Sequence, residues 1–127
     1  MSQHTDQPLN ILVVDDDILV REVTALMLAD VGHAVIEAED GVEALAKLTD
    51  TGAIDLVITD INMPRMDGLA LAREMRTRWP GVPVLLVSGR PQPSCLHVMT
   101  KPFGWTTLVD TVRRVMCNGP QPVAAGV

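Results

Sequence analysis

Five short apolar runs, rich in β-branched residues, recur along the chain, and segments of helical periodicity follow four of them. This alternation is typical of βαβ units and a parallel sheet. The central runs are nearly continuously apolar, as expected for strands that helices cover on both faces. The predicted strands are Ile11 to Val14, Ala34 to Glu37, Leu56 to Thr59, Val82 to Val87 and His97 to Thr100.

Apolar residues at helical spacing predict four amphipathic helices between and after these strands. Gly32 and Pro80 are expected to end the first and the third, because glycine favours helix C-termini and proline cannot continue a helix. The apolar stripes are formed by Val20, Val23, Met27 and Val31; by Val42, Leu45 and Leu48; by Ala72, Met75 and Trp79; and by Leu108, Val112 and Val115.

The connection between the fourth and fifth strands is too short for a helix. It reads SGRPQPSCL, from Ser88 to Leu96, and a crossover that contains a helix needs about a dozen residues or more. Pro91 and Pro93 also exclude a regular helix interior. Because nine extended residues can span roughly 30 Å, a loop could still join two parallel strands. We therefore expect five parallel strands and four helices, with an irregular segment where a fifth helix would otherwise lie.

Polar side chains follow four of the five strands, at the point where each strand ends. In an open parallel sheet these carboxyl ends form one edge, where ligands bind near the topological switch point. The residues expected at this edge are Asp15, Asp16 and Asp17 after the first strand, Asp60 and Asn62 after the third, Ser88 after the fourth and Lys101 after the fifth. Asp17 is more simply explained as the N-cap of the first helix.

Carboxylates at close range raise one another's pKa unless a cation neutralises them, and hard divalent ions prefer oxygen ligands. The cluster therefore predicts a site for Mg²⁺ or Mn²⁺. A bound Mg²⁺, a free carboxylate, a hydroxyl and a lysine together supply what phosphoryl transfer to an aspartate requires.

The stretches VVDDD, DLVITDINMPRMDGL, VLLVSG and TKPF occur in the order found in receiver domains of two-component response regulators, which this chain resembles over residues 9–117. The resemblance implies a flavodoxin-like, doubly wound five-stranded parallel sheet of order 2-1-3-4-5. It implies a domain that accepts a phosphoryl group from a histidine kinase or a histidine phosphotransfer protein. Its fourth helix is replaced here by the irregular segment. Residues 1–8 are expected to be a flexible N-terminus, and residues 118–127 a disordered tail.

Carried over to this sequence, the resemblance makes Asp60 the phosphoacceptor. Asp15 and Asp16 would hold the metal ion together with Asp60 and the backbone carbonyl of Asn62. Ser88 would hydrogen-bond the phosphoryl group, and Lys101 would pair with its charge. The Lys101–Pro102 peptide bond would be cis and would help to aim the lysine. Pro64 and Gly68 would shape the loop that follows Asp60.

In the family that the chain resembles, three further positions influence how long the phosphoryl group lasts and how the domain signals to its partners. Asn62 and Arg90 would flank the path of an attacking water. Val98 occupies a position that is usually aromatic in the family, and the missing helix belongs to the usual output surface. We expect phosphorylation to order or move residues 89–96 instead, an order–disorder type of switch.

Composition limits the classes of partner. The 127 residues suffice for one domain, and 47% of them are hydrophobic, which supports a single packed fold. A net charge of −6 makes nucleic-acid binding by this chain an unfavourable hypothesis. The N-terminus MSQHTDQP lacks the pattern of a secretion signal, and no apolar run approaches the length of a membrane span. A cytoplasmic protein without membrane or nucleic-acid partners is therefore expected.

Two other functions compete with that of a stand-alone receiver that signals through an unknown downstream protein or acts as a phosphoryl sink. A Mg²⁺-dependent phosphohydrolase would use the same aspartyl-phosphate chemistry, but the chain has no residues left for the substrate-selecting cap of such enzymes. A degenerate receiver would bind partners without phosphorylation. The intact set of carboxylates, serine and lysine argues against it, since a binding module has no need of a costly cluster of charges.

Overall fold

The computed structural model describes residues 8–63, 65–89 and 98–118. A parallel sheet of order β2-β1-β3-β4-β5 forms its centre. The predicted order and the doubly wound, flavodoxin-like architecture are thus confirmed. The strands are β1 (Asn10–Val14), β2 (Ala34–Ala38), β3 (Leu56–Asp60), β4 (Val84–Ser88) and β5 (Val98–Thr100).

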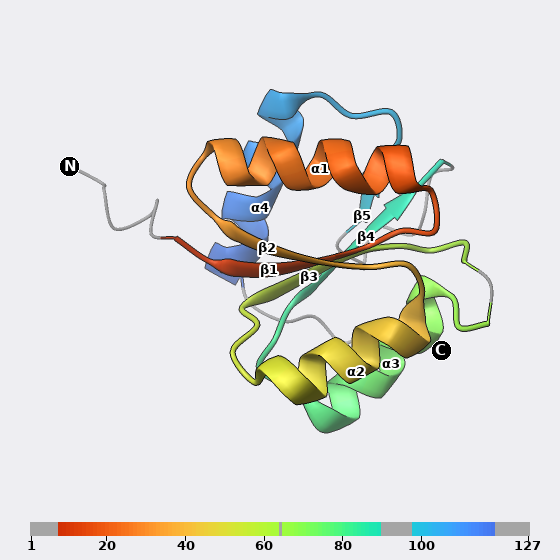
Figure 1. Cartoon of the computed structure of the whole chain (residues 1–127). Helices are drawn as coiled ribbons and strands as arrows, with labels where there is room; N and C mark the ends of the chain where they lie inside the picture. Colours follow the sequence, from red (N-terminus) through yellow and green to blue (C-terminus); the bar gives the residue numbers. More distant parts are fainter. Residues whose placement is uncertain (1–7, 64, 90–97, 119–127) are drawn as a thin grey trace.

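The helices cover both faces of this sheet, with α1 and α4 on one face and α2 and α3 on the other (Figure 1). Alternate residues of each strand serve the two layers: in β1, Ile11 and Val13 pack in one core cluster, whereas Leu12 and Val14 pack in the second. Both faces of the sheet are therefore dry, which explains the continuously apolar strand sequences. The helices are α1 (Ile18–Asp30), α2 (Gly41–Thr51), α3 (Gly68–Arg78) and α4 (Trp105–Asn118).

Aspartate caps begin three of the helices. Asp17, Asp40 and Asp67 precede α1, α2 and α3, and each side chain accepts hydrogen bonds from backbone N–H groups of the first turn. The expected capping role of Asp17 is confirmed. At the other end of α1, Gly32 has a φ of 101°, which lets the chain turn directly into β2.

The fourth strand starts two residues later than predicted. The N–H of Val82 donates to the carbonyl of Trp79 in a turn, and Pro83 has no N–H to donate, so regular pairing starts at Val84. Within the described ranges no helix lies between β4 and β5, although residues 90–97 of this connection lie outside them. No helix in the described part of the chain is long and apolar enough to span a membrane.

Candidate functional site

The carboxyl ends of four strands meet at one edge of the sheet and bring the predicted polar residues together. Asp60 is the last residue of β3 and Ser88 the last of β4, and Lys101 directly follows β5. Backbone hydrogen bonds fix this alignment, from Lys101 N–H to the Ser88 carbonyl at 2.7 Å and from Ile61 N–H to the Val87 carbonyl at 3.0 Å. Because β1 and β3 are neighbours whose connections leave in opposite directions, the site lies at the topological switch point.

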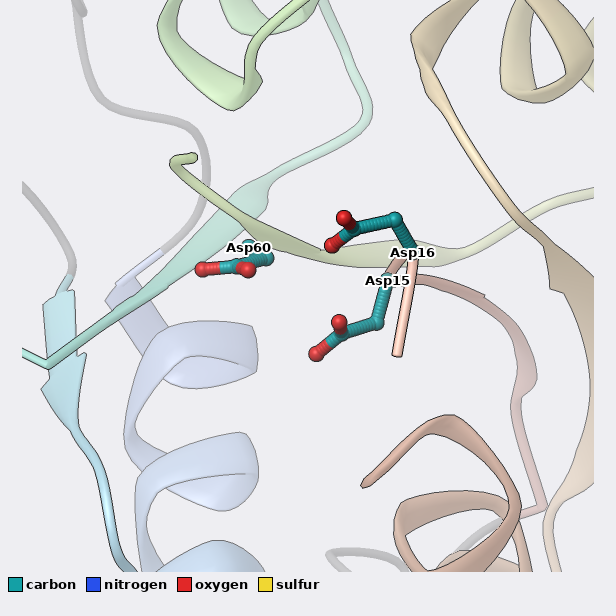
Figure 2. Close-up of side chains that lie close together, drawn as sticks. All are labelled: Asp15, Asp16 and Asp60. Atoms are coloured by element: carbon teal, nitrogen blue, oxygen red, sulfur yellow. The ribbon is translucent and has the colours of Figure 1, made fainter. Parts of the chain in front are cut away.

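Three carboxylates form the centre of the site. Each of Asp15, Asp16 and Asp60 offers an oxygen, and these oxygens lie within 4.8 Å of one another. Figure 2 shows Asp15 and Asp16 leaving adjacent backbone positions, with Asp60 beside them on β3. Asp15 and Asp60 are buried, at 4% and 8% exposure, whereas Asp16 is exposed. The site is therefore open to a ligand from the side of Asp16.

Lys101 provides the positive charge of this cluster. Its Nζ lies 3.2 Å from Asp15 Oδ2 and 3.4 Å from Asp60 Oδ2. The Lys101–Pro102 peptide bond is cis, as predicted. Partial burial disfavours the charged amine, but the carboxylates of Asp15 and Asp60 outweigh that effect and raise the pKa of Lys101. The lysine is thus a fixed cation between two carboxylates.

For Asp60, in contrast, the effects that disfavour the charged form are the stronger ones. Burial raises its pKa above the ordinary value for an aspartate, and the negative charge of Asp15 adds to the shift, while Lys101 and the backbone N–H of Asn62 counter it. Lys101 therefore compensates the negative charge of Asp60 only in part. An additional cation beside it would offset the repulsion.

Asp15 is held by contacts that the sequence analysis did not anticipate. Its Oδ1 accepts from the N–H of Asp17 at 2.9 Å, and its carbonyl accepts from Arg21 Nη1 at 2.8 Å. Arg21 also donates from Nε to Glu37 at 3.0 Å. A cation in the first turn of a helix is disfavoured by the macrodipole, and the contacts with Asp15 and Glu37 offset that cost.

The loop after Asp60 folds back tightly on the strand. The N–H of Gly68 donates to the Ile61 carbonyl at 2.8 Å. A Cβ atom at position 68 would lie 2.9 Å from Ile61 Cα and 3.0 Å from the Asp60 carbonyl carbon, and closer still to the carbonyl oxygen. Only glycine fits against the end of β3 here, which gives the predicted role of Gly68 a physical cause. Pro64 lies outside the described residues.

The remaining predicted site residues differ in how deeply they are buried. Ser88 is buried at 1% exposure, and Asn62 is exposed in the loop after Asp60. Val98 is half-buried, begins β5 and pairs with Leu86, so an aliphatic residue stands at this strand start. Arg90, and with it all but Gly89 of the predicted switch segment 89–96, lies outside the described residues.

The donor set fits a hard divalent cation. Mg²⁺ binds through carboxylate oxygens, keeps several waters and requires little enclosure by protein. Two buried carboxylates with one exposed neighbour meet those needs. The repulsion between Asp15 and Asp60, which Lys101 offsets only in part, favours the same ion. Receiver domains bind Mg²⁺ at such an acidic cluster.

Known proteins resemble the chain along most of its length. The sequence model of the response regulator receiver domain matches residues 11–113. Response regulator MprA of Mycobacterium sp. (strain KMS) is 42% identical over 83 residues, which are 65% of this chain and 36% of MprA. Sensor kinase CckA of Brucella abortus (strain 2308) is 34% identical over 116 residues, 84% of this chain but 12% of that kinase. The chain thus spans about a third or less of these relatives.

Solved structures agree. Chemotaxis protein CheY4 of Vibrio cholerae superposes with a TM-score of 0.80 at 32% identity and covers 86% of this chain and 99% of its own. The receiver domain of the hybrid histidine kinase CckA gives a TM-score of 0.74 at 37% identity, with 83% and 96% coverage. With the fold, the acidic cluster and the lysine in place, the chain belongs to the response regulator receiver domains of two-component signalling.

Proposed function

We propose that Asp60 accepts a phosphoryl group from the phosphohistidine of a histidine kinase or a histidine phosphotransfer protein. One observation carries the proposal: the buried Asp60 lies at a strand end with Lys101 Nζ 3.4 Å from its Oδ2 and two further carboxylates beside it. A purely structural aspartate does not require two further carboxylates and a lysine beside it. An aspartate that accepts a phosphoryl group does require charged neighbours, because they position the group and stabilise its charge.

The transfer would proceed by attack of an Asp60 carboxylate oxygen on the phosphorus. The phosphorus–nitrogen bond of the donor breaks, its electron pair stays with the imidazole, and an acyl phosphate forms on Asp60. Lys101, held between Asp15 and Asp60, supplies an ammonium group next to the incoming phosphoryl oxygens. Ser88, at the end of the neighbouring strand, provides a hydroxyl for a second phosphoryl oxygen.

Asp15, Asp16, Asp60 and the backbone carbonyl of Asn62 would hold Mg²⁺, or Mn²⁺ in its place. When bound, the ion neutralises charge on the carboxylates and on the transferred phosphoryl group. The protein contributes the burial of Asp15 and Asp60, which keeps bulk water from competing for their charge. The N–H of Asp17 and the guanidinium of Arg21 fix Asp15 in place for this task.

An apolar groove beside the site suits a helical phosphodonor protein. The groove, about 300 Å³ in volume, lies between α1 and the turn after β5, and Leu19, Val23 and Phe103 line it together with the site residue Lys101. Leu19 is 71% and Val23 48% exposed. Exposed apolar side chains that gather in one groove, rather than lie scattered singly, are typical of a surface that a partner covers. Because Lys101 lines the groove and its Nζ lies 3.4 Å from Asp60 Oδ2, a donor that binds there would lie beside Asp60.

The chemistry is tested by phosphorylation with a small phosphodonor such as acetyl phosphate, followed by a phosphate-affinity gel. We expect a shifted band for the wild type with Mg²⁺, and none for Asp60→Asn or with EDTA. Absence of the shift in every lane would overturn the proposal. It would favour the alternative of a degenerate receiver that binds partners without phosphorylation.

The docking surface is tested by Leu19→Glu. We expect this variant to accept the phosphoryl group normally from acetyl phosphate but at least about tenfold more slowly from a phosphodonor protein, because a charge in an apolar contact costs roughly 1 to 3 kcal/mol. Val42→Glu is the matched control, since Val42 is 47% exposed on α2, which covers the opposite face of the sheet. Equal transfer to both variants would exclude the groove as the donor surface.

A further inference from the structure

The loop that follows Asp60 contacts the sheet through Gly68, and it makes a second contact with the start of α2. Arg65 has a φ of 66° and is the one non-glycine residue with positive φ in the described ranges. Such a conformation is uncommon for a residue with a long side chain, and the surrounding contacts must stabilise it. The Arg65 side chain is bound to Asp40, the N-cap of α2.

Asp40 is fully engaged by this contact. Arg65 Nε donates to Asp40 Oδ2 at 3.0 Å, and Nη2 of the same guanidinium contacts that oxygen as well. The other carboxylate oxygen, Oδ1, accepts from the Glu43 N–H at 2.8 Å. The backbone N–H of Glu43 and then Arg65 lower the pKa of Asp40, which is 3% exposed. One buried carboxylate thus joins the start of α2 to the loop that carries Asn62.

The next residue of the loop adds a packing contact at the same place. A Cβ atom on Gly41 would lie 2.7 Å from Met66 Cγ and 2.9 Å from the Met66 carbonyl oxygen. The loop therefore lies directly on the first turn of α2. Together with the Gly68–Ile61 hydrogen bond at its far end, the contact with α2 holds a short loop whose first residues are the acceptor and a proposed metal ligand.

Neither contact is needed to close the turn. Glycine adopts positive φ readily, and a different N-cap residue would start α2 equally well. Arg65 instead bridges the loop to a buried charge, at the expense of an unfavourable backbone conformation. This combination favours a role in orienting the loop.

We propose that Arg65 and Asp40 form a positioning pair that sets the orientation of the Asp60 loop, and thereby the Mg²⁺ affinity and the phosphorylation rate of Asp60. The inference rests on the proposed function. It deepens that function, because it assigns control of the acceptor geometry to two residues outside the acidic cluster. Both act through the loop backbone and neither touches the phosphoryl group.

Substitutions at the two positions separate this role from a structural one. Arg65→Gly removes the guanidinium but suits the positive φ, and Asp40→Asn removes the charge but keeps a capping side chain. We expect each to slow phosphorylation of Asp60 by acetyl phosphate about tenfold, as a small misplacement of reacting groups does. We also expect weaker Mg²⁺ binding by titration calorimetry. The double variant should be no slower than either single one, since the two residues act as a unit.

Two controls complete the experiment. Arg65→Lys keeps the charge and should recover part of the rate and the affinity. Arg114→Gln removes one positive charge from an exposed position on α4 and should match the wild type.

Amide exchange provides a readout that requires no phosphorylation. In the Mg²⁺-free protein, exchange should be faster in residues 61–68 of Arg65→Gly than in the wild type.

The outcomes distinguish this inference from the proposed function. A wild type that does not become phosphorylated refutes the proposed function, and the pair is then judged by Mg²⁺ affinity and loop exchange alone. A phosphorylated wild type whose rate and Mg²⁺ affinity are matched by Arg65→Gly and Asp40→Asn refutes the positioning pair while the function stands. Additive effects in the double variant also refute it.

Discussion

Replacement of Gly68 by alanine should destabilise the fold and displace Asp60. The added methyl group would lie 2.9 Å from Ile61 Cα and 3.0 Å from the Asp60 carbonyl carbon, and nearer still to its oxygen. These neighbours are backbone atoms at the end of β3, so no side chain can rotate away. Ordinary carbon contacts lie at about 3.5 to 4.0 Å, so the strand end or the start of α3 must move by roughly 1 Å.

The cost follows from overpacking. Forced insertion of a methyl group into a packed site costs about 1 to 3 kcal/mol, and a rigid backbone neighbour places Gly68→Ala at the upper end. For a chain of 127 residues, about 2 to 3 kcal/mol corresponds to a fall in the melting temperature of about 10 °C. The displaced Asp60 should also accept a phosphoryl group at least about tenfold more slowly.

Urea unfolding and the phosphate-affinity gel measure the two effects. Gly81→Ala is the matched control, because Gly81 has no positive φ and a Cβ atom there meets nothing within 4 Å. We expect this control to match or slightly exceed the wild type in stability, since alanine restricts the unfolded chain. A Gly68→Ala protein with the stability and phosphorylation rate of the Gly81→Ala control would refute the argument from backbone contact.

Three further predictions concern the charges of the site. In EDTA, Asp60→Asn should be more stable than the wild type at neutral pH: burial raises the folded pKa of Asp60, so wild-type stability falls as pH rises through that pKa, and the difference should vanish in acid urea titrations. Mg²⁺ at a hundredfold excess over Kd should stabilise the wild type by about 2.7 kcal/mol, and Asp16→Asn should gain less at the same concentration in urea unfolding. Arg21→Met should lose about 1 to 2 kcal/mol in the same assay, because the contacts to Asp15 and Glu37 disappear, whereas Arg114→Met on α4 should be neutral. A variant whose stability equals that of the wild type in one of these measurements would contradict the role given there to Asp60, Asp16 or Arg21.

The strands and the acidic cluster were predictable because their chemistry is local in sequence. A continuously apolar run followed by Asp15 and Asp16 identifies both a strand and its end. Parallel pairing then brings separate strand ends to one edge, so Asp60, Ser88 and Lys101 could be placed together before their distances were known. The resemblance to receiver domains supplied the strand order and the cis Lys101–Pro102 bond.

The supporting contacts could not be predicted in the same way. Arg21 and Arg65 are ordinary charged residues in the sequence, and their roles depend on partners far along the chain, Glu37 for the first and Asp40 for the second. The steric need for Gly68 depends on how closely the loop returns to β3. Such contacts are set by tertiary packing, and neither periodicity nor spacing reveals them. The early start predicted for β4 failed for a local reason, the turn at Val82.

The phosphoacceptor assignment can be tested at the level of the residue that carries the phosphoryl group. The wild type is incubated with acetyl phosphate and Mg²⁺ and then reduced with borohydride, which converts an acyl phosphate on aspartate to homoserine, and the peptides are sequenced by mass spectrometry. We expect homoserine at position 60 alone, and its loss when Mg²⁺ is replaced by EDTA. Homoserine at Asp15 or Asp16, or at no position while Mg²⁺ binding is intact, would contradict Asp60 as the acceptor.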